Sequence, residues 1–153
     1  MARTDLLDNL NKALGLELAA VIQYSQHSYL VTGHEREIFK DWFRDQAEEA
    51  QDHANTLGDK IVALGGVPAI EPAMIRQSVE LSEMLKQDLE LEREALAVYM
   101  AAWASCDESD LPQKFWLEGQ ISDEQMHVEE LEKLTSERKS RVDSEKIILR
   151  EVS

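Results

Sequence analysis

Apolar residues recur at steps of three and four along nearly the whole chain, with polar residues between them. This period predicts amphipathic α-helices. Four long segments carry the pattern, at about 5–31, 36–64, 78–105 and 111–137. Few turn residues interrupt it: Gly33 can close the first segment, Gly65 and Gly66 end the second, and Asp110 is a candidate N-cap for the fourth. The sequence therefore predicts an all-α protein.

The lengths of the connections predict how the helices are arranged. Short turns join the first segment to the second and the third to the fourth, so each pair should form an antiparallel hairpin. The 13 residues from Gly65 to Gln77 reach about 43 Å when extended, and a helix of ~27 residues is about 40 Å long. This connection can therefore cross the whole bundle and make the second and third helices parallel. The alternative is an up-down bundle with a loose loop.

Composition narrows the class of protein further. The 153 residues are 43% apolar and 31% charged, which suits one domain with one core. The formal charge of −15 disfavours nucleic acid and anionic membranes as partners. No apolar run approaches the roughly 20 residues that span a bilayer, and the first ten residues carry no signal-peptide pattern, so we expect a cytoplasmic protein. The single Cys106 excludes an internal disulfide and a cysteine zinc site.

The two predicted hairpins repeat each other when aligned on His53 and His127. Glu17 precedes His53 by 36 residues, and Glu92 precedes His127 by 35. Three further pairs keep the same offset from these histidines: Trp42 and Trp116, Gln46 and Gln120, Leu57 and Leu131. Two more keep the same offset from Glu17 and Glu92: Tyr24 and Tyr99, Leu14 and Leu89. So many matches indicate a duplicated hairpin. Counting out and back along each hairpin also places each glutamate level with its histidine.

These polar residues lie on apolar stripes, where a carboxylate is costly to bury unless it is paired or bound to a metal. Glu124 joins them, because it precedes His127 by three residues and so shares its helical face. Three carboxylates and two imidazoles at one level of a core need a cation. Oxygen and imidazole ligands of this kind suit iron or manganese.

A glutamate from each first helix, with Glu-x-x-His from a second helix, resembles the di-iron carboxylate pattern of the ferritin-like bundle. The stretches LNKALGLELAAVIQY (10–24), DHANTLGDKIVALGGVP (52–68), MLKQDLELEREAL (84–96) and SDEQMHVEELEKL (122–134) are similar to the four helices of bacterioferritins and bacterial ferritins. The resemblance implies a single ferritin-like domain with a bundle at about 5–137. The polar tail, 138–153, would form a short fifth helix or a docked arm.

The resemblance also implies roles for individual residues. Glu17 and Glu92 would be terminal metal ligands, His53 and His127 would each bind one iron, and Glu124 would bridge the two ions. Tyr24 would be the tyrosine beside the site, as an electron donor or a hydrogen-bond partner.

The first hairpin departs from the family pattern at Ala50, where the family has a second bridging glutamate. The neighbouring Glu49 lies about 40° from His53 on a helical wheel, against about 60° for residue 50, and an i,i+4 pair can share a metal. Against a ligand role, its counterpart in the second half, Asp123, is also acidic. Both readings of Glu49 stay open, and we favour a supporting role. The family's haem-binding Met is replaced by Gln51, so we do not expect haem.

The function predicted from these residues is that of a ferritin-like ferroxidase, which oxidises Fe(II) with O2 or H2O2 and stores or detoxifies iron. By family analogy it would form a homo-oligomeric cage of 12 or 24 subunits. Ala50 would make its site asymmetric or weak. Two alternatives remain: a rubrerythrin-like peroxidase or di-manganese catalase, and a non-catalytic bundle whose site has decayed. His27 and His34 are expected at the solvent or at a subunit interface.

Overall fold

A computed structural model describes residues 2–135, and these residues form four long helices without any strand. The helices are α1 (Ala2–Leu30), α2 (Arg36–Ala63), α3 (Leu81–Ala104) and α4 (Leu111–Leu134). The prediction of an all-α four-helix bundle is confirmed. The fifth helix or arm predicted for the tail lies outside the described residues.

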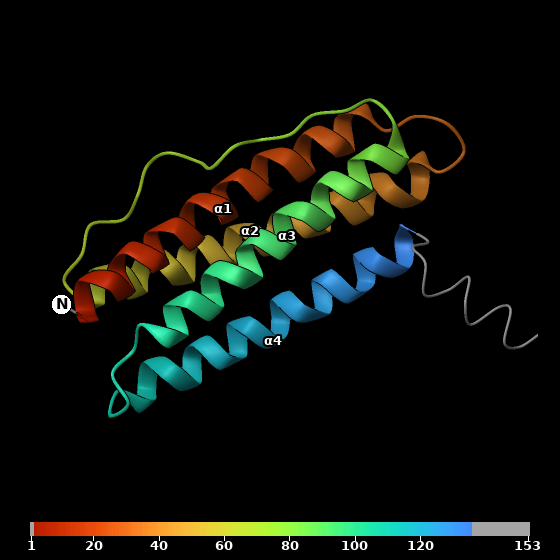
Figure 1. Cartoon of the computed structure of the whole chain (residues 1–153). Coiled ribbons are helices and arrows are strands. Elements are labelled where there is room, and N and C mark those ends of the chain that lie inside the picture. The colour runs from red at the N-terminus through yellow and green to blue at the C-terminus, as the bar shows by residue number, and fades with distance from the viewer. Residues whose placement is uncertain (1, 136–153) are drawn as a thin grey trace, which may run out of the picture.

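The chain path is that of two hairpins joined by one long crossover (Figure 1). α1 and α2 are antiparallel, as are α3 and α4, and the segment between α2 and α3 runs back along the whole bundle (Figure 1). α2 and α3 are therefore parallel, as the length of the connection predicted. None of the helices in residues 2–135 is long and apolar enough to cross a membrane.

Glycines shape two of the turns. Gly33 and Gly65 have positive φ angles of 87° and 89°, a region that favours glycine because it has no Cβ. Gly33 lies just beyond α1 and Gly65 just beyond α2. Asp110 lies directly before α4, as predicted, but its side chain makes no capping hydrogen bond.

Apolar layers close the interior of the bundle on both sides of its middle. Toward one end the fully buried side chains include Leu10, Leu57 and Leu117, and toward the other end they include Phe43, Leu89 and Leu131. Full burial of one such side chain contributes about 1.5–3 kcal/mol. The level between these layers is consequently shielded from water by apolar side chains above and below.

The crossover is fixed to α1 by hydrogen bonds at intervals along its length. The side chain of Asn11 donates to the carbonyl of Val67 (3.1 Å) and accepts from the amide of Ala69 (2.8 Å). One turn later, the carbonyl of Gly15 accepts from the amide of Ala73 (2.8 Å). A Cβ at residue 15 would lie 3.4 Å from a crossover carbonyl oxygen, so the two backbones approach closely there. The alternative of a loose loop is therefore wrong.

Replacing Asn11 by Ala should destabilise the bundle by releasing this part of the crossover. The substitution removes two hydrogen bonds, each worth about 1 kcal/mol, so the free energy of unfolding should fall by about 1–2 kcal/mol. Urea denaturation followed by circular dichroism measures this difference. The neighbouring exposed Lys12→Ala is the control, and equal stability of the two variants would show that the Asn11 contacts do not hold the crossover.

Candidate metal centre

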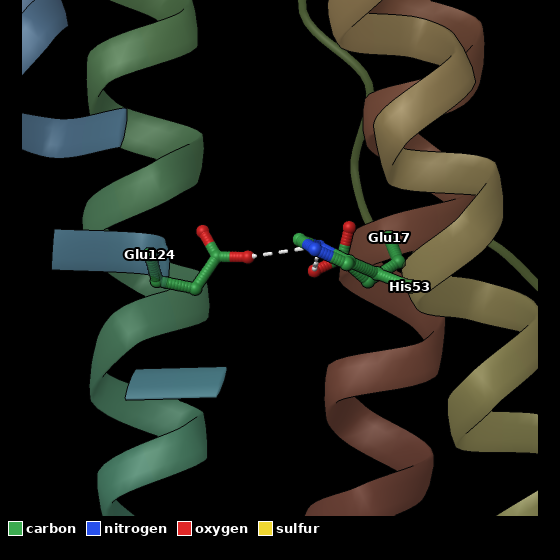
Figure 2. A group of neighbouring side chains, drawn as sticks. All are labelled: Glu17, His53 and Glu124. Atoms are coloured by element: carbon green, nitrogen blue, oxygen red, sulfur yellow. Dashed lines mark ion pairs between the residues drawn. The ribbon is translucent and has the colours of Figure 1, made fainter. Parts of the chain in front are cut away.

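Five of the predicted side chains meet at the level between the apolar layers. Glu17 extends from α1, His53 from α2 and Glu92 from α3, while Glu124 and His127 extend from α4. Glu124 points from α4 toward His53 and Glu17 on the opposite pair of helices (Figure 2). Counting along each hairpin predicts equal heights for Glu17 and His53 and for Glu92 and His127, and the packing of the two hairpins brings both pairs to one level around Glu124.

The five side chains form two groups that share one carboxylate. In the first group, His53 Nδ1 lies 3.4 Å from Glu17 Oε1 and 3.4 Å from Glu124 Oε1. In the second, His127 Nδ1 lies 3.7 Å from Glu92 Oε2 and 3.7 Å from Glu124 Oε2. The candidate ligand atoms within each group all lie within 4.8 Å of one another. Each group offers two carboxylates and one imidazole nitrogen, a donor set that iron and manganese accept.

Several of these polar atoms are buried and make no close hydrogen bond within residues 2–135. Glu124 is 1% exposed, and its two carboxylate oxygens have only the longer ion-pair contacts with His53 and His127. His127 Nδ1 is likewise buried and has only its contacts of 3.7 Å with Glu92 and Glu124. A buried polar atom left unsatisfied costs about 1–3 kcal/mol, and more when it is charged. Cations bound between the two groups would satisfy all three atoms at once, so these residues fit a pair of metal ions.

The crowding of acidic groups changes their proton affinities. Burial and the nearby Glu124 carboxylate raise the pKa of Glu92 to about 7. Burial lowers the pKa of His53, but its bonds to Glu124 and Glu17 outweigh this and raise the pKa to about 10. Burial also lowers the pKa of His127, but its bonds to Glu124 and Glu92 outweigh this and raise the pKa to about 11. Without metal, the centre therefore holds protons at neutral pH in place of cations.

Two tyrosines hold the terminal glutamates, each reaching across from the other half of the repeat. The Tyr24 hydroxyl on α1 donates to Glu92 Oε1 on α3 (2.7 Å), and the Tyr99 hydroxyl on α3 donates to Glu17 Oε1 on α1 (3.0 Å). Burial and these carboxylates raise the pKa of both phenols well above the ordinary value. Both tyrosines therefore remain neutral donors. The resemblance implies a role for Tyr24 and none for Tyr99, although Tyr99 follows Glu92 by seven residues just as Tyr24 follows Glu17.

Glu49 lies on the outer side of His127. Its Oε1 is 3.0 Å from His127 Nε2, and its side chain is 45% exposed. Glu49 does not belong to either inner group of candidate ligands. A carboxylate on the outer nitrogen of a histidine fixes the orientation of the ring and leaves Nδ1 free to bind a metal.

Ala50 is only 5% exposed and offers no polar atom to the centre. Glu17 corresponds to Glu92 and His53 to His127 in the two halves of the repeat. Glu124 has no carboxylate counterpart, because Ala50 occupies the equivalent position. The centre is asymmetric for this reason, with one carboxylate between the two histidines.

A second buried polar cluster, formed by His27, Asp88 and Gln23, lies beside Tyr24 and Glu92. His27 is 0% exposed, so its expected place at the solvent or an interface is wrong. Its Nδ1 faces the carboxylate of Asp88 on α3, which also accepts a hydrogen bond from Gln23. The sequence signal was available, because Asp88 precedes Glu92 by one helical turn and so shares its buried face.

Comparison with known proteins gives consistent matches over most of the chain. A family model described as a ferritin-like domain matches residues 7–140. A bacterioferritin from Brucella melitensis is 34% identical over 133 residues, which cover 83% of this chain and 80% of that protein.

Solved structures agree with the sequence matches. Ferritin-like diiron-carboxylate proteins from Bacillus anthracis superpose with a TM-score of 0.85 at 30% identity, covering 89% of this chain and 99% of that chain. A dodecameric thioferritin from Bacteroides fragilis, described as bacterioferritin-related, gives a TM-score of 0.78 at 25% identity over 94% of this chain and 90% of that one. The chain belongs to the ferritin-like domain family.

Proposed function

We propose that this protein binds two Fe(II) ions in the middle of the bundle and oxidises them, as part of iron storage or detoxification. The observation that carries the proposal is Glu124, a fully buried carboxylate that lies between two Glu–His pairs and whose oxygens make only ion-pair contacts of 3.4 and 3.7 Å with the two histidines. Burying three carboxylates at one level is costly, and two protonated histidines compensate only part of their charge, so the arrangement favours bound cations. Family membership supports iron as that cation.

Each residue has a distinct part in this proposal. Glu17 and His53 would bind one ion, Glu92 and His127 the other, and Glu124 both. The iron ions are the substrate, and O2 or H2O2 accepts their electrons. The carboxylates favour the higher charge of Fe(III), and Tyr24 and Tyr99 keep the terminal glutamates in place. Tyr24 is also the candidate electron donor beside the site.

Glu49 has a supporting role in this account. Its contact with the outer nitrogen of His127 supports orientation of that ring rather than replacement of the glutamate missing at Ala50. One ion would then have fewer protein ligands than in a centre with two bridging glutamates. Gln51 offers no sulfur ligand, so haem is not part of the proposal.

The proposed assembly is a closed homo-oligomeric cage. The match to a thioferritin that is described as dodecameric supports 12 subunits, and 24 remains the alternative within the family. The charge of −15 favours small cations over nucleic acid as the partner.

Anaerobic titration with Fe(II) or Co(II) tests the metal centre directly. We expect two ions per chain, and Glu124→Gln should weaken binding at least about 100-fold, since loss of even a supporting residue costs 10- to 100-fold. The exposed neighbour Asp123→Asn is the matched control. A stoichiometry near zero in the unsubstituted protein would favour a bundle with a decayed site.

Peroxide assays with iron against manganese loading separate a ferroxidase from a peroxidase or catalase.

Metal affinity should rise with pH between about 6 and 8. The raised pKa values of His53 and His127 mean that each ring keeps a proton in the metal-free protein, and a metal must displace it. Each displaced proton makes the affinity change about tenfold per pH unit. Calorimetry in buffers of different ionisation enthalpy counts the protons released. An affinity that does not change over this range would show that the histidines are not the groups displaced.

The substitution Ala50→Glu should raise the rate of Fe(II) oxidation if the missing carboxylate limits it. The new side chain would supply a second carboxylate one turn before His53 and lower the residual positive charge of two bound ions. Stopped-flow absorbance under O2 measures the rate. An unchanged rate, with two ions still bound, would contradict this explanation of the asymmetry.

A further inference from the structure

The buried cluster next to the candidate metal centre consists of His27, Asp88 and Gln23, each 0% exposed. Gln23 is adjacent in sequence to Tyr24, and Asp88 lies one helical turn before Glu92. The cluster therefore joins α1 to α3 directly beside the Tyr24–Glu92 hydrogen bond. Neither His27 nor Asp88 belongs to the groups that can hold a metal.

Two glutamine side chains contact the pair, Gln23 and Gln87, and contacts with the crossover determine how each is oriented. The backbone amide of Arg76 donates to Gln23 Oε1 (3.0 Å), so the amide nitrogen of Gln23 faces Asp88 Oδ1 (2.9 Å). Gln87 Nε2 donates to the carbonyl of Gln77 (3.2 Å), so its oxygen faces His27 Nε2 (3.2 Å). Because an amide oxygen only accepts, His27 Nε2 must carry a proton.

The other ring nitrogen also faces an acceptor. His27 Nδ1 lies 3.0 Å from Asp88 Oδ1 and 3.1 Å from Asp88 Oδ2. A proton must lie between these two groups, and the hydrogen bond that Asp88 accepts from Gln23 favours an ionised carboxylate with the proton on His27. We propose that His27 is a doubly protonated imidazolium paired with an ionised Asp88, and that this buried pair positions Tyr24 and Glu92 and locks the crossover onto the bundle.

Opposing effects act on the charge of the pair. Burial and the nearby Glu92 raise the pKa of Asp88, and the hydrogen bonds from His27 and Gln23 offset part of that increase. The other ionisable groups that face the pair are Glu92 on α3 and Tyr24 on α1. α2 contributes the ring of Phe43, 5.3 Å from the His27 ring in an edge-on arrangement. The crossover contributes the amide of Arg76 and the carbonyl of Gln77, and the guanidinium of Arg76 pairs through Nη2 with Glu90 and Glu94.

The chain of hydrogen bonds begins and ends on adjacent crossover residues, the amide of Arg76 and the carbonyl of Gln77. Loss of either charge would leave the other buried without compensation, which is strongly destabilising. The crossover would then open locally at this point, while the apolar layers keep the helices folded. Trypsin cleavage after Arg76 reports such an opening.

Two measurements on the metal-free full-length protein test the pair. First, ¹⁵N NMR of the His27 ring should show both nitrogens protonated at neutral pH. Second, Asp88→Asn should make cleavage after Arg76 roughly tenfold faster or more, with helical circular dichroism retained. The control is Gln26→Ala, which removes an exposed hydrogen bond to the same part of the crossover. A singly protonated His27, or equal cleavage rates in Asp88→Asn and Gln26→Ala, would overturn the proposal.

A third measurement tests the positioning role and depends on the proposed metal centre. Co(II) affinity should fall several-fold in Asp88→Asn and stay unchanged in Gln26→Ala. If the unsubstituted protein binds no Co(II), the proposed function fails, while the NMR and cleavage results still decide the charge of the pair. If Asp88→Asn does not fold, Gln87→Ala replaces it, because it removes the acceptor at His27 Nε2 and the donor to Gln77. Gln87→Ala should also cleave faster than Gln26→Ala, and no difference would contradict the lock.

Discussion

The burial of negative charge is the constraint on which this structure depends. Glu17, Glu92 and Glu124 lie at one level of an apolar bundle, where water cannot solvate them. Two histidines and two tyrosines face these carboxylates. The two histidines occupy equivalent positions in the internal repeat, and so do the two tyrosines. Without metal, protons on His53 and His127 offset part of the charge, but these rings lie 3.4 and 3.7 Å from the Glu124 oxygens, which have no closer partner within residues 2–135. The bundle holds these acids together at a cost that bound cations would remove.

The internal repeat explains both the order and the asymmetry of the centre. The tyrosines cross between the halves, so that α1 and α3 each hold the glutamate of the other. The duplicated hairpins consequently depend on one another at the level of the site. Ala50 is the one position where the repeat fails among the candidate ligands, and it leaves Glu124 to serve both histidines. Glu49, on the outer side of His127, does not restore the missing carboxylate to the interior in this structure.

The helices and the crossover could be predicted because they depend on local periodicity and on chain length. Equal offsets in the two hairpins were enough to group Glu17 with His53 and Glu92 with His127. The partners of Tyr24 and Tyr99 could not be derived from spacing, since a repeat shows equivalent positions and not which half a side chain reaches into. The direction of Glu49 depends on side-chain rotamers that a helical wheel does not represent. His27 was misplaced because its burial depends on partners from α3 and α2, and the one signal in the sequence, the spacing of Asp88 from Glu92, does not show which side chain Asp88 meets.

Anomalous diffraction at the iron absorption edge, on crystals soaked anaerobically with Fe(II), would locate iron bound inside the bundle. We expect two iron peaks in each bundle, one among Glu17, His53 and Glu124 and the other among Glu92, His127 and Glu124. We also expect Glu49 on the outer nitrogen of His127, away from both peaks. Iron confined to the acidic surface, with no peak beside Glu124, would contradict iron binding at this centre.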